Sequence, residues 1–89
     1  MLKSKNEIGE LIRNFRIRNS MTQNELAQKL NVSNSAVSNW ENGETNIDID
    51  LLDKLADLMK ITIDELIRKQ EYNDDYFIYE VMNFNGLEI

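Results

Sequence analysis

The stretch from Thr22 to Gly43, TQNELAQKLNVSNSAVSNWENG, decides the fold of this 89-residue chain. Thr22 and Glu25 have the spacing of a capping box, in which a hydroxyl and a carboxylate exchange hydrogen bonds with backbone amides, so a helix begins there. Asn31 tolerates the left-handed backbone conformation and predicts a tight turn after that helix. Ser33 is the N-cap candidate of a second helix, which ends at Gly43, where glycine is favoured. The stretch therefore predicts two short helices joined by a tight turn.

The chain on either side predicts three further helices. Ser4 with Glu7, and Thr62 with Glu65, repeat the capping box, and Asp48 is a single N-cap candidate. Apolar residues recur at helical spacing after each cap, which predicts one buried face per helix. These residues are Ile8, Leu11, Ile12, Phe15, Leu26, Ala27, Leu30, Val37, Trp40, Leu52, Leu55, Ala56, Met59, Ile63, Leu66 and Ile67. The pattern predicts an all-α domain of five short helices.

The composition changes after Lys69. Residues 71–75 are polar and acidic, and residues 76–84, YFIYEVMNF, are aromatic and β-branched without a helical stripe. Such a segment is more typical of a strand than of a helix. The chain is therefore divided into a helical domain, residues 1–69, and a short C-terminal extension, residues 70–89, with the character of a β-strand.

The charge is distributed unevenly along the chain. Residues 1–40 carry six basic and three acidic groups, a net charge of +3, whereas residues 41–89 carry four basic and 13 acidic groups, a net charge of −9. The overall charge of −6 argues against a nucleic-acid partner, but the basic N-terminal part keeps such a partner open. The alternative is a set of solvated helix faces without a partner.

The sequence contains no Cys and no His. Disulfides and thiolate metal sites are thereby excluded, and the commonest general base and zinc ligand are absent. We therefore expect no metal, no cofactor and no enzymatic activity. The N-terminus has no long apolar run, so we expect no signal peptide, no membrane span and a cytoplasmic protein.

Two short helices with a tight turn form the unit that places its second helix in a DNA major groove. Residues 8–67 resemble the Cro/repressor-type helix-turn-helix family, also called the XRE family. The resemblance rests on IGELIRNFR, MTQNELAQKLNVSNSAVSNWENG and LLDKLADLMKITIDELI, in this order and without large gaps. It implies a five-helix, lambda-repressor-like DNA-binding domain. The implied function is sequence-specific transcriptional regulation, by a dimeric repressor bound to double-stranded DNA.

The resemblance also implies roles for individual residues. Base contacts are expected from Asn34, Ser35 and Asn39, and a contact to a base edge or a phosphate from Ser38. Phosphate contacts are expected from Gln23, Asn42, Arg13 and Arg18. Asn side chains both donate to and accept from adenine, so A·T pairs are favoured. Arg16 and Glu41 match a family pair that ties the first helix to the end of the third.

Some features depart from the family pattern. Residues 34–42 contain no Lys or Arg, and the acidic residues Glu44, Asp48 and Asp50 lie near a loop that approaches the DNA backbone in the family. Ile47 replaces the family proline. Because phosphate neutralisation supplies much of the affinity for DNA, we expect weak binding by one chain. Either a dimer adds a second half-site, or the fold serves as a protein-interaction module, such as an antitoxin-like or anti-repressor partner.

An apolar surface for pairing is also predicted. Leu51 and Leu58 lie seven residues apart, offset from the inward stripe of the fourth helix. The extension contributes Tyr76, Phe77, Ile78, Tyr79 and Phe84. So much apolar surface is unfavourable in water. We expect the extension to pack on the helical domain, to pair with a second copy of the chain, or to accept a strand of another protein.

Overall fold

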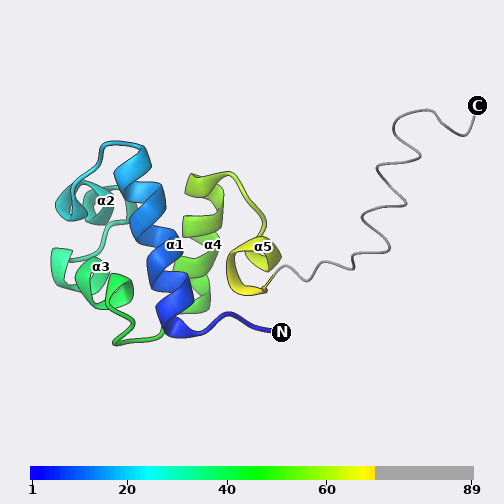
Figure 1. Ribbon diagram of the computed structural model, residues 1–89. Coiled ribbons are helices and arrows are strands. Elements are labelled where there is room, and N and C mark those ends of the chain that lie inside the picture. The colour runs from blue at the N-terminus through cyan, green and yellow to red at the C-terminus, as the bar shows by residue number, and fades with distance from the viewer. Residues whose placement is uncertain (70–89) are drawn as a thin grey trace, which may run out of the picture.

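The computed structural model describes residues 1–69, which form five helices and no extended strand (Figure 1). The helices are α1 (Lys5–Arg18), α2 (Gln23–Leu30), α3 (Asn34–Glu41), α4 (Ile49–Met59) and α5 (Ile63–Ile67). The expected all-α, five-helix architecture is therefore confirmed. The proposed strand and the aromatic residues Tyr76, Phe77, Ile78, Tyr79 and Phe84 lie outside the described residues.

The helix starts follow the capping residues of the sequence. Ser4, Thr22 and Thr62 each accept a hydrogen bond from a backbone amide three residues on, and the capping box is complete in all three helices. Ser33 caps α3 in the same way, accepting from the amide of Ala36. Asp48 is at the N-cap of α4, but its side chain makes no capping hydrogen bond. A side-chain cap thus sets the start of four of the five helices.

In the view of Figure 1, α2 and α3 are drawn on one side of α1 and α4 and α5 on the other, and α2 also contacts α4. Helix α1 packs mainly on α3, while α2 packs on α3 and α4 packs on α5. The buried apolar core joins all five helices. Its members are Ile12, Leu26, Ala27, Leu30, Val37, Trp40, Leu55, Ala56 and Leu66.

The two ends of the described chain are held together. The Lys3 N–H donates to the Ile67 carbonyl at 2.7 Å, and the Lys69 N–H donates to the Met1 carbonyl at 2.8 Å. Leu2 and Arg68 form an isolated antiparallel bridge between these two bonds. The Lys3 ammonium also donates to carbonyls at the end of α5, where a positive charge is favoured by the helix dipole. The sequence analysis did not anticipate this pairing.

Candidate nucleic-acid interface

The turn between α2 and α3 sets the direction of α3. Asn31 ends α2 in the left-handed conformation, with φ 59° and ψ 46°. The Val32 N–H then donates to the Ala27 carbonyl at 2.9 Å, which closes the turn. Val37 is fully buried, so α3 directs this side of the helix into the core. The opposite side of α3 is left facing outward.

Four polar residues lie away from the core on α3. Asn34 and Ser35, in its first turn, are exposed, and Ser38 and Asn39, in its second turn, are half-buried. Within residues 1–69, none of these four side chains makes a hydrogen bond to the protein. An amide or hydroxyl in this state keeps its full donor and acceptor capacity for an external ligand.

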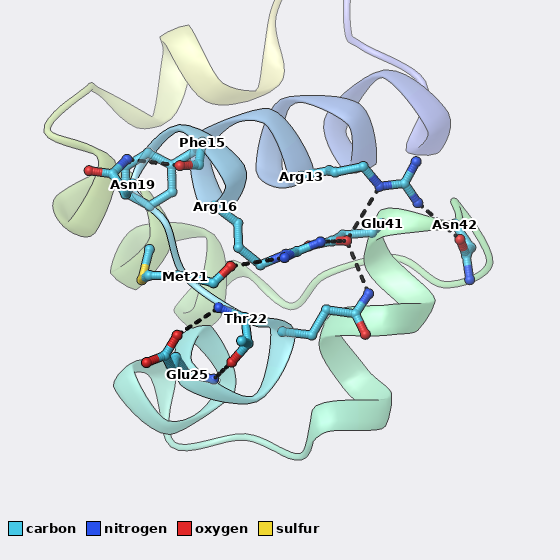
Figure 2. Close-up of polar contacts among 10 residues, drawn as sticks. Arg13, Phe15, Arg16, Asn19, Met21, Thr22, Glu25, Glu41 and Asn42 are labelled. Atoms are coloured by element: carbon cyan, nitrogen blue, oxygen red, sulfur yellow. Dashed lines mark hydrogen bonds and ion pairs between the residues drawn. The ribbon is translucent and has the colours of Figure 1, made fainter.

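Glu41, the last residue of α3, is the centre of a polar network between α1, α2 and α3 (Figure 2). Its side chain is fully buried, and Arg16 donates to both carboxylate oxygens, from Nε at 2.7 Å and from Nη2 at 3.0 Å. Gln23 Nε2 donates to Glu41 Oε1 at 3.1 Å, and Arg13 Nε lies 3.5 Å from the same oxygen. A side-on guanidinium–carboxylate pair is strong and directional. The network therefore fixes α1, α2 and the end of α3 relative to one another.

The carboxylate of Glu41 stays ionised despite its burial. Burial alone raises the pKa of Glu41. The hydrogen bonds from Arg16 and Gln23 and the charge of Arg16 together outweigh this effect, so the pKa lies below its ordinary value. The same pair raises the pKa of Arg16. A fixed charge pair thus joins the last turn of α3 to α1.

Three of the four predicted phosphate-contacting residues belong to this network. Gln23 and Arg13 donate to Glu41, and Arg13 Nη2 donates to Asn42 Oδ1 at 3.2 Å. Arg18 stands apart at the exposed end of α1 and makes none of these contacts. The family resemblance implies phosphate contacts for all three residues and implies in addition that Gln23 braces α3. It does not predict that Arg13 contacts Asn42 or that Arg13 contacts Glu41.

Gly9 has a structural role in this arrangement that was not foreseen from the sequence. A Cβ atom at this position would overlap the backbone oxygen of Trp40 and lie 2.8 Å from the backbone oxygen of Glu41. Helix α1 therefore approaches the end of α3 as closely as backbone allows. A glycine inside a helical pattern is the signal that could have revealed this approach.

The predicted pairing surface is partly occupied by the domain itself. Leu51 and Leu58 are half-buried and pack against the core. In contrast, Ile49, at the start of α4, has 65% of its surface exposed. Of Leu51 and Leu58, only the parts that remain exposed can contact a second molecule.

Residues 1–69 contain no group of three or more acidic side chains arranged to hold a metal ion. Nor does this part of the chain include a helix that combines the length and the apolar character needed to cross a bilayer.

Two helices are joined by a tight turn in which Asn31 has the left-handed conformation, the second helix has an outward polar face, and a buried Arg–Glu pair holds its end. These features define a helix-turn-helix protein. The helix-turn-helix family HTH_3 matches residues 12–66, and the chain belongs to this family. The family expected from the sequence is thereby confirmed.

Two curated relatives have similar sequences. The transcriptional regulator ImmR of Bacillus subtilis is 36% identical over 64 residues, which are 72% of this chain and 50% of ImmR. The transcriptional activator BcrR of Enterococcus faecalis is 34% identical over 65 residues, which are 73% of this chain and 32% of BcrR. The matched region thus spans half or less of each relative's length.

A solved structure extends the comparison to three dimensions. The P22 c2 repressor protein, crystallised in complex with a synthetic operator, is 34% identical and superimposes with a TM-score of 0.62. The match covers 66% of this chain and 89% of the repressor. The fold of residues 1–69 is therefore that of the phage-repressor type of helix-turn-helix domain.

Proposed function

We propose that this protein binds double-stranded DNA with α3 in the major groove and regulates transcription, as a repressor that occupies a promoter. One observation carries the proposal: the side chains of Asn34, Ser35, Ser38 and Asn39 lie on the outward side of α3 and have no hydrogen-bond partner within residues 1–69. A similar chain, the P22 c2 repressor, was solved with a synthetic operator, which supports the same use of the fold here. Acting on the genome, the protein works in the cytoplasm.

The residues of α3 suit the reading of A·T pairs. An asparagine amide donates to N7 and accepts from the N6 amino group of adenine, and one good bidentate contact contributes about 1–3 kcal/mol of discrimination. Asn34 and Asn39 perform this role, and Ser35 and Ser38 add contacts of low selectivity. The preferred half-site therefore contains A·T pairs among the few base pairs that α3 can reach.

The Glu41 network supports DNA binding in two ways. It holds α3 rigidly, so the base-contacting side chains are placed before DNA arrives. It also leaves donors for phosphates, because Arg13 has five N–H groups, uses Nε and Nη2 within the protein, and keeps 42% of its side-chain surface exposed. Gln23, at the start of α2, places a second donor beside the free amides of a helix N-terminus.

One domain offers few cations to DNA, so two chains bind together. Residues 34–42 contain no Lys or Arg, and counterion release by Arg13, Arg18 and a few lysines gives weak binding per chain. A pair of chains contacts two half-sites about one helical turn of DNA apart, and the operator is then an inverted repeat. The exposed parts of Leu51 and Leu58 contribute to the contact between the chains.

Selection of bound duplexes from a random pool, at low and at physiological salt, tests this proposal. The wild-type chain is expected to enrich an inverted repeat with A·T pairs, and a variant carrying Asn34→Ala and Asn39→Ala is expected to lose it. Asn14→Ala is the matched control, because Asn14 is exposed on α1 and lies outside α3. Failure of the wild-type chain to enrich any sequence, even at low salt, would refute the proposal.

A second function is favoured by the charge of the chain. The exposed residues Glu44, Asp48 and Asp50 follow α3 and would repel phosphates. A protein-interaction module on the same fold, such as an antitoxin-like or anti-repressor partner, would use this acidic surface. Its signature is retained binding to a protein partner together with no enrichment of DNA.

A further inference from the structure

An open apolar groove of about 250 Å³ lies beside the N-terminal segment of the domain, with Trp40 of α3 in its lining. The N-terminal segment, α1, the α3–α4 loop, α4 and α5 all contribute to it. Its apolar lining includes Leu2, Ile8, Ile47, Leu52 and Ile67. For scale, an apolar cavity of about 150 Å³ is enough to hold one benzene ring. The groove is therefore large enough for an aromatic side chain.

We propose that this groove is the docking site for residues 76–84 of the same chain. The described chain ends at the groove: Ile67 lines it, and two residues later the Lys69 N–H is bonded to the Met1 carbonyl beside Leu2. Six residues, 70–75, join this point to the docking segment. Fully extended they span about 20 Å, so the segment can fold back, and closing so short a loop costs little entropy.

The chemistry of the docking segment matches the lining of the groove. The sequence YFIYEVMNF offers aromatic and β-branched side chains that lose free energy when left in water. The groove offers Leu2, of which 60% is exposed, and half-buried isoleucine side chains. Docking removes both apolar surfaces from water.

Charge complementarity favours the same occupant. Residues 70–89 carry five acidic groups and no basic group, a net charge of −5, whereas residues 1–69, with ten basic and eleven acidic groups, have a net charge of −1. Lys3 and Lys5 both line the groove. Lys3 is held in place by hydrogen bonds to the Glu65 and Leu66 carbonyls, so its charge is fixed at the groove. Three of the five acidic groups lie in the joining residues 70–75 and one, Glu80, lies in the docking segment, so both parts are attracted to this wall of the groove.

A spin label on the tail tests the docking directly in the full-length protein without DNA. The chain has no cysteine, so Asn83→Cys places one label within the docking segment. The methyl signals of Ile8, Ile47 and Ile67 are expected to broaden strongly. Ile17 is the reference, because it lies nine residues along α1 from Ile8, about 14 Å away.

Matched charge reversals and a mixing experiment complete the test. Lys5→Glu is expected to reduce the broadening at the groove several-fold, and the helix start tolerates an acidic residue there. Lys54→Glu makes the same change on α4 outside the groove lining and is expected to have no effect. Equal broadening of Ile17 and Ile47, no broadening, or no effect of Lys5→Glu overturns the proposal. Broadening that appears only when labelled tails are mixed with unlabelled, isotope-enriched chains also overturns it, because the tail then docks on a second copy.

Discussion

Replacement of Glu41 by Ala is the most informative test of how α3 is held. The substitution removes a fully buried carboxylate that accepts hydrogen bonds from Arg16, Gln23 and Arg13. It leaves the Arg16 side chain, which is only 15% exposed, with its Nε and Nη2 donors unpaired. The remaining bond from Arg16 Nη1 to the Met21 carbonyl, at 2.9 Å, is unaffected.

The expected loss of stability follows from this geometry. Removing one partner of a buried ion pair costs about 3–5 kcal/mol, since the other charge is left without compensation. The slight exposure of Arg16 places the change near the lower end, so we expect Glu41→Ala to lower the free energy of unfolding by about 3 kcal/mol. A domain of this size has a total of about 3–10 kcal/mol, so the loss is a large share of its stability. Glu41→Gln keeps the shape and one acceptor, but it removes the charge and turns the other acceptor into a donor that faces Arg16, so it is expected to cost about 2–3 kcal/mol.

Urea unfolding followed by Trp40 fluorescence measures the change. The fluorescence reports the core directly, because Trp40 is the only tryptophan of the chain and is buried. Glu44→Ala is the control, because Glu44 is exposed and three residues away; its effect is expected to stay within about 0.5 kcal/mol. A loss below about 1 kcal/mol for Glu41→Ala would show that the network contributes little and that the reasoning is wrong.

Three further predictions concern stability and use the same unfolding assay. The pKa of Glu41 is lower in the folded than in the unfolded protein, so its charge stabilises the fold above the unfolded pKa of about 4.3. This contribution is lost as the pH falls through the lower folded pKa, and the stability difference between wild type and Glu41→Gln should therefore shrink below about pH 4. A difference that stays constant with pH would contradict this prediction. Gly9→Ala is expected to lower the free energy of unfolding by about 1–3 kcal/mol, although alanine has the better helix propensity. The reason is that the new Cβ overlaps the Trp40 carbonyl and forces α1 away from α3. An increase in stability would show that no close approach exists. Lys60→Gly is expected to stabilise by up to about 1 kcal/mol, because Lys60 ends α4 with φ 61°, and a loss of stability would contradict that backbone strain.

Local features of the fold could be predicted from the sequence. Capping residues and turn chemistry act within a few positions, so the three capping boxes and the left-handed Asn31 follow directly from the residue types. The apolar stripes included every buried core residue, because a helix fixes which residues share a face, but they also included Phe15, which is not part of the core. The helix-turn-helix family could be recognised for the same reason, since its motif is contiguous in the chain.

Apart from the Arg16–Glu41 pair, which the family resemblance implied, contacts between distant segments could not be predicted in this way. The convergence of Arg13 and Gln23 on Glu41 depends on the packing of three helices, which no single window of sequence contains. The bridge between Leu2 and Arg68 likewise joins residues from opposite ends of the domain. Gly9 carries no local signal of what it touches, because its role depends on the backbone of α3.

A binding titration of Asn39→Ala against altered duplexes tests the central claim most directly. If Asn39 reads an adenine, one A·T to G·C change in the selected half-site weakens wild-type binding by about 1–3 kcal/mol, roughly 5- to 150-fold. The variant is then expected to bind the original and the altered duplex equally at that position, while still discriminating at the others. If Asn39→Ala instead weakens binding to all duplexes by the same factor and keeps the discrimination, α3 does not read that base and the account is contradicted.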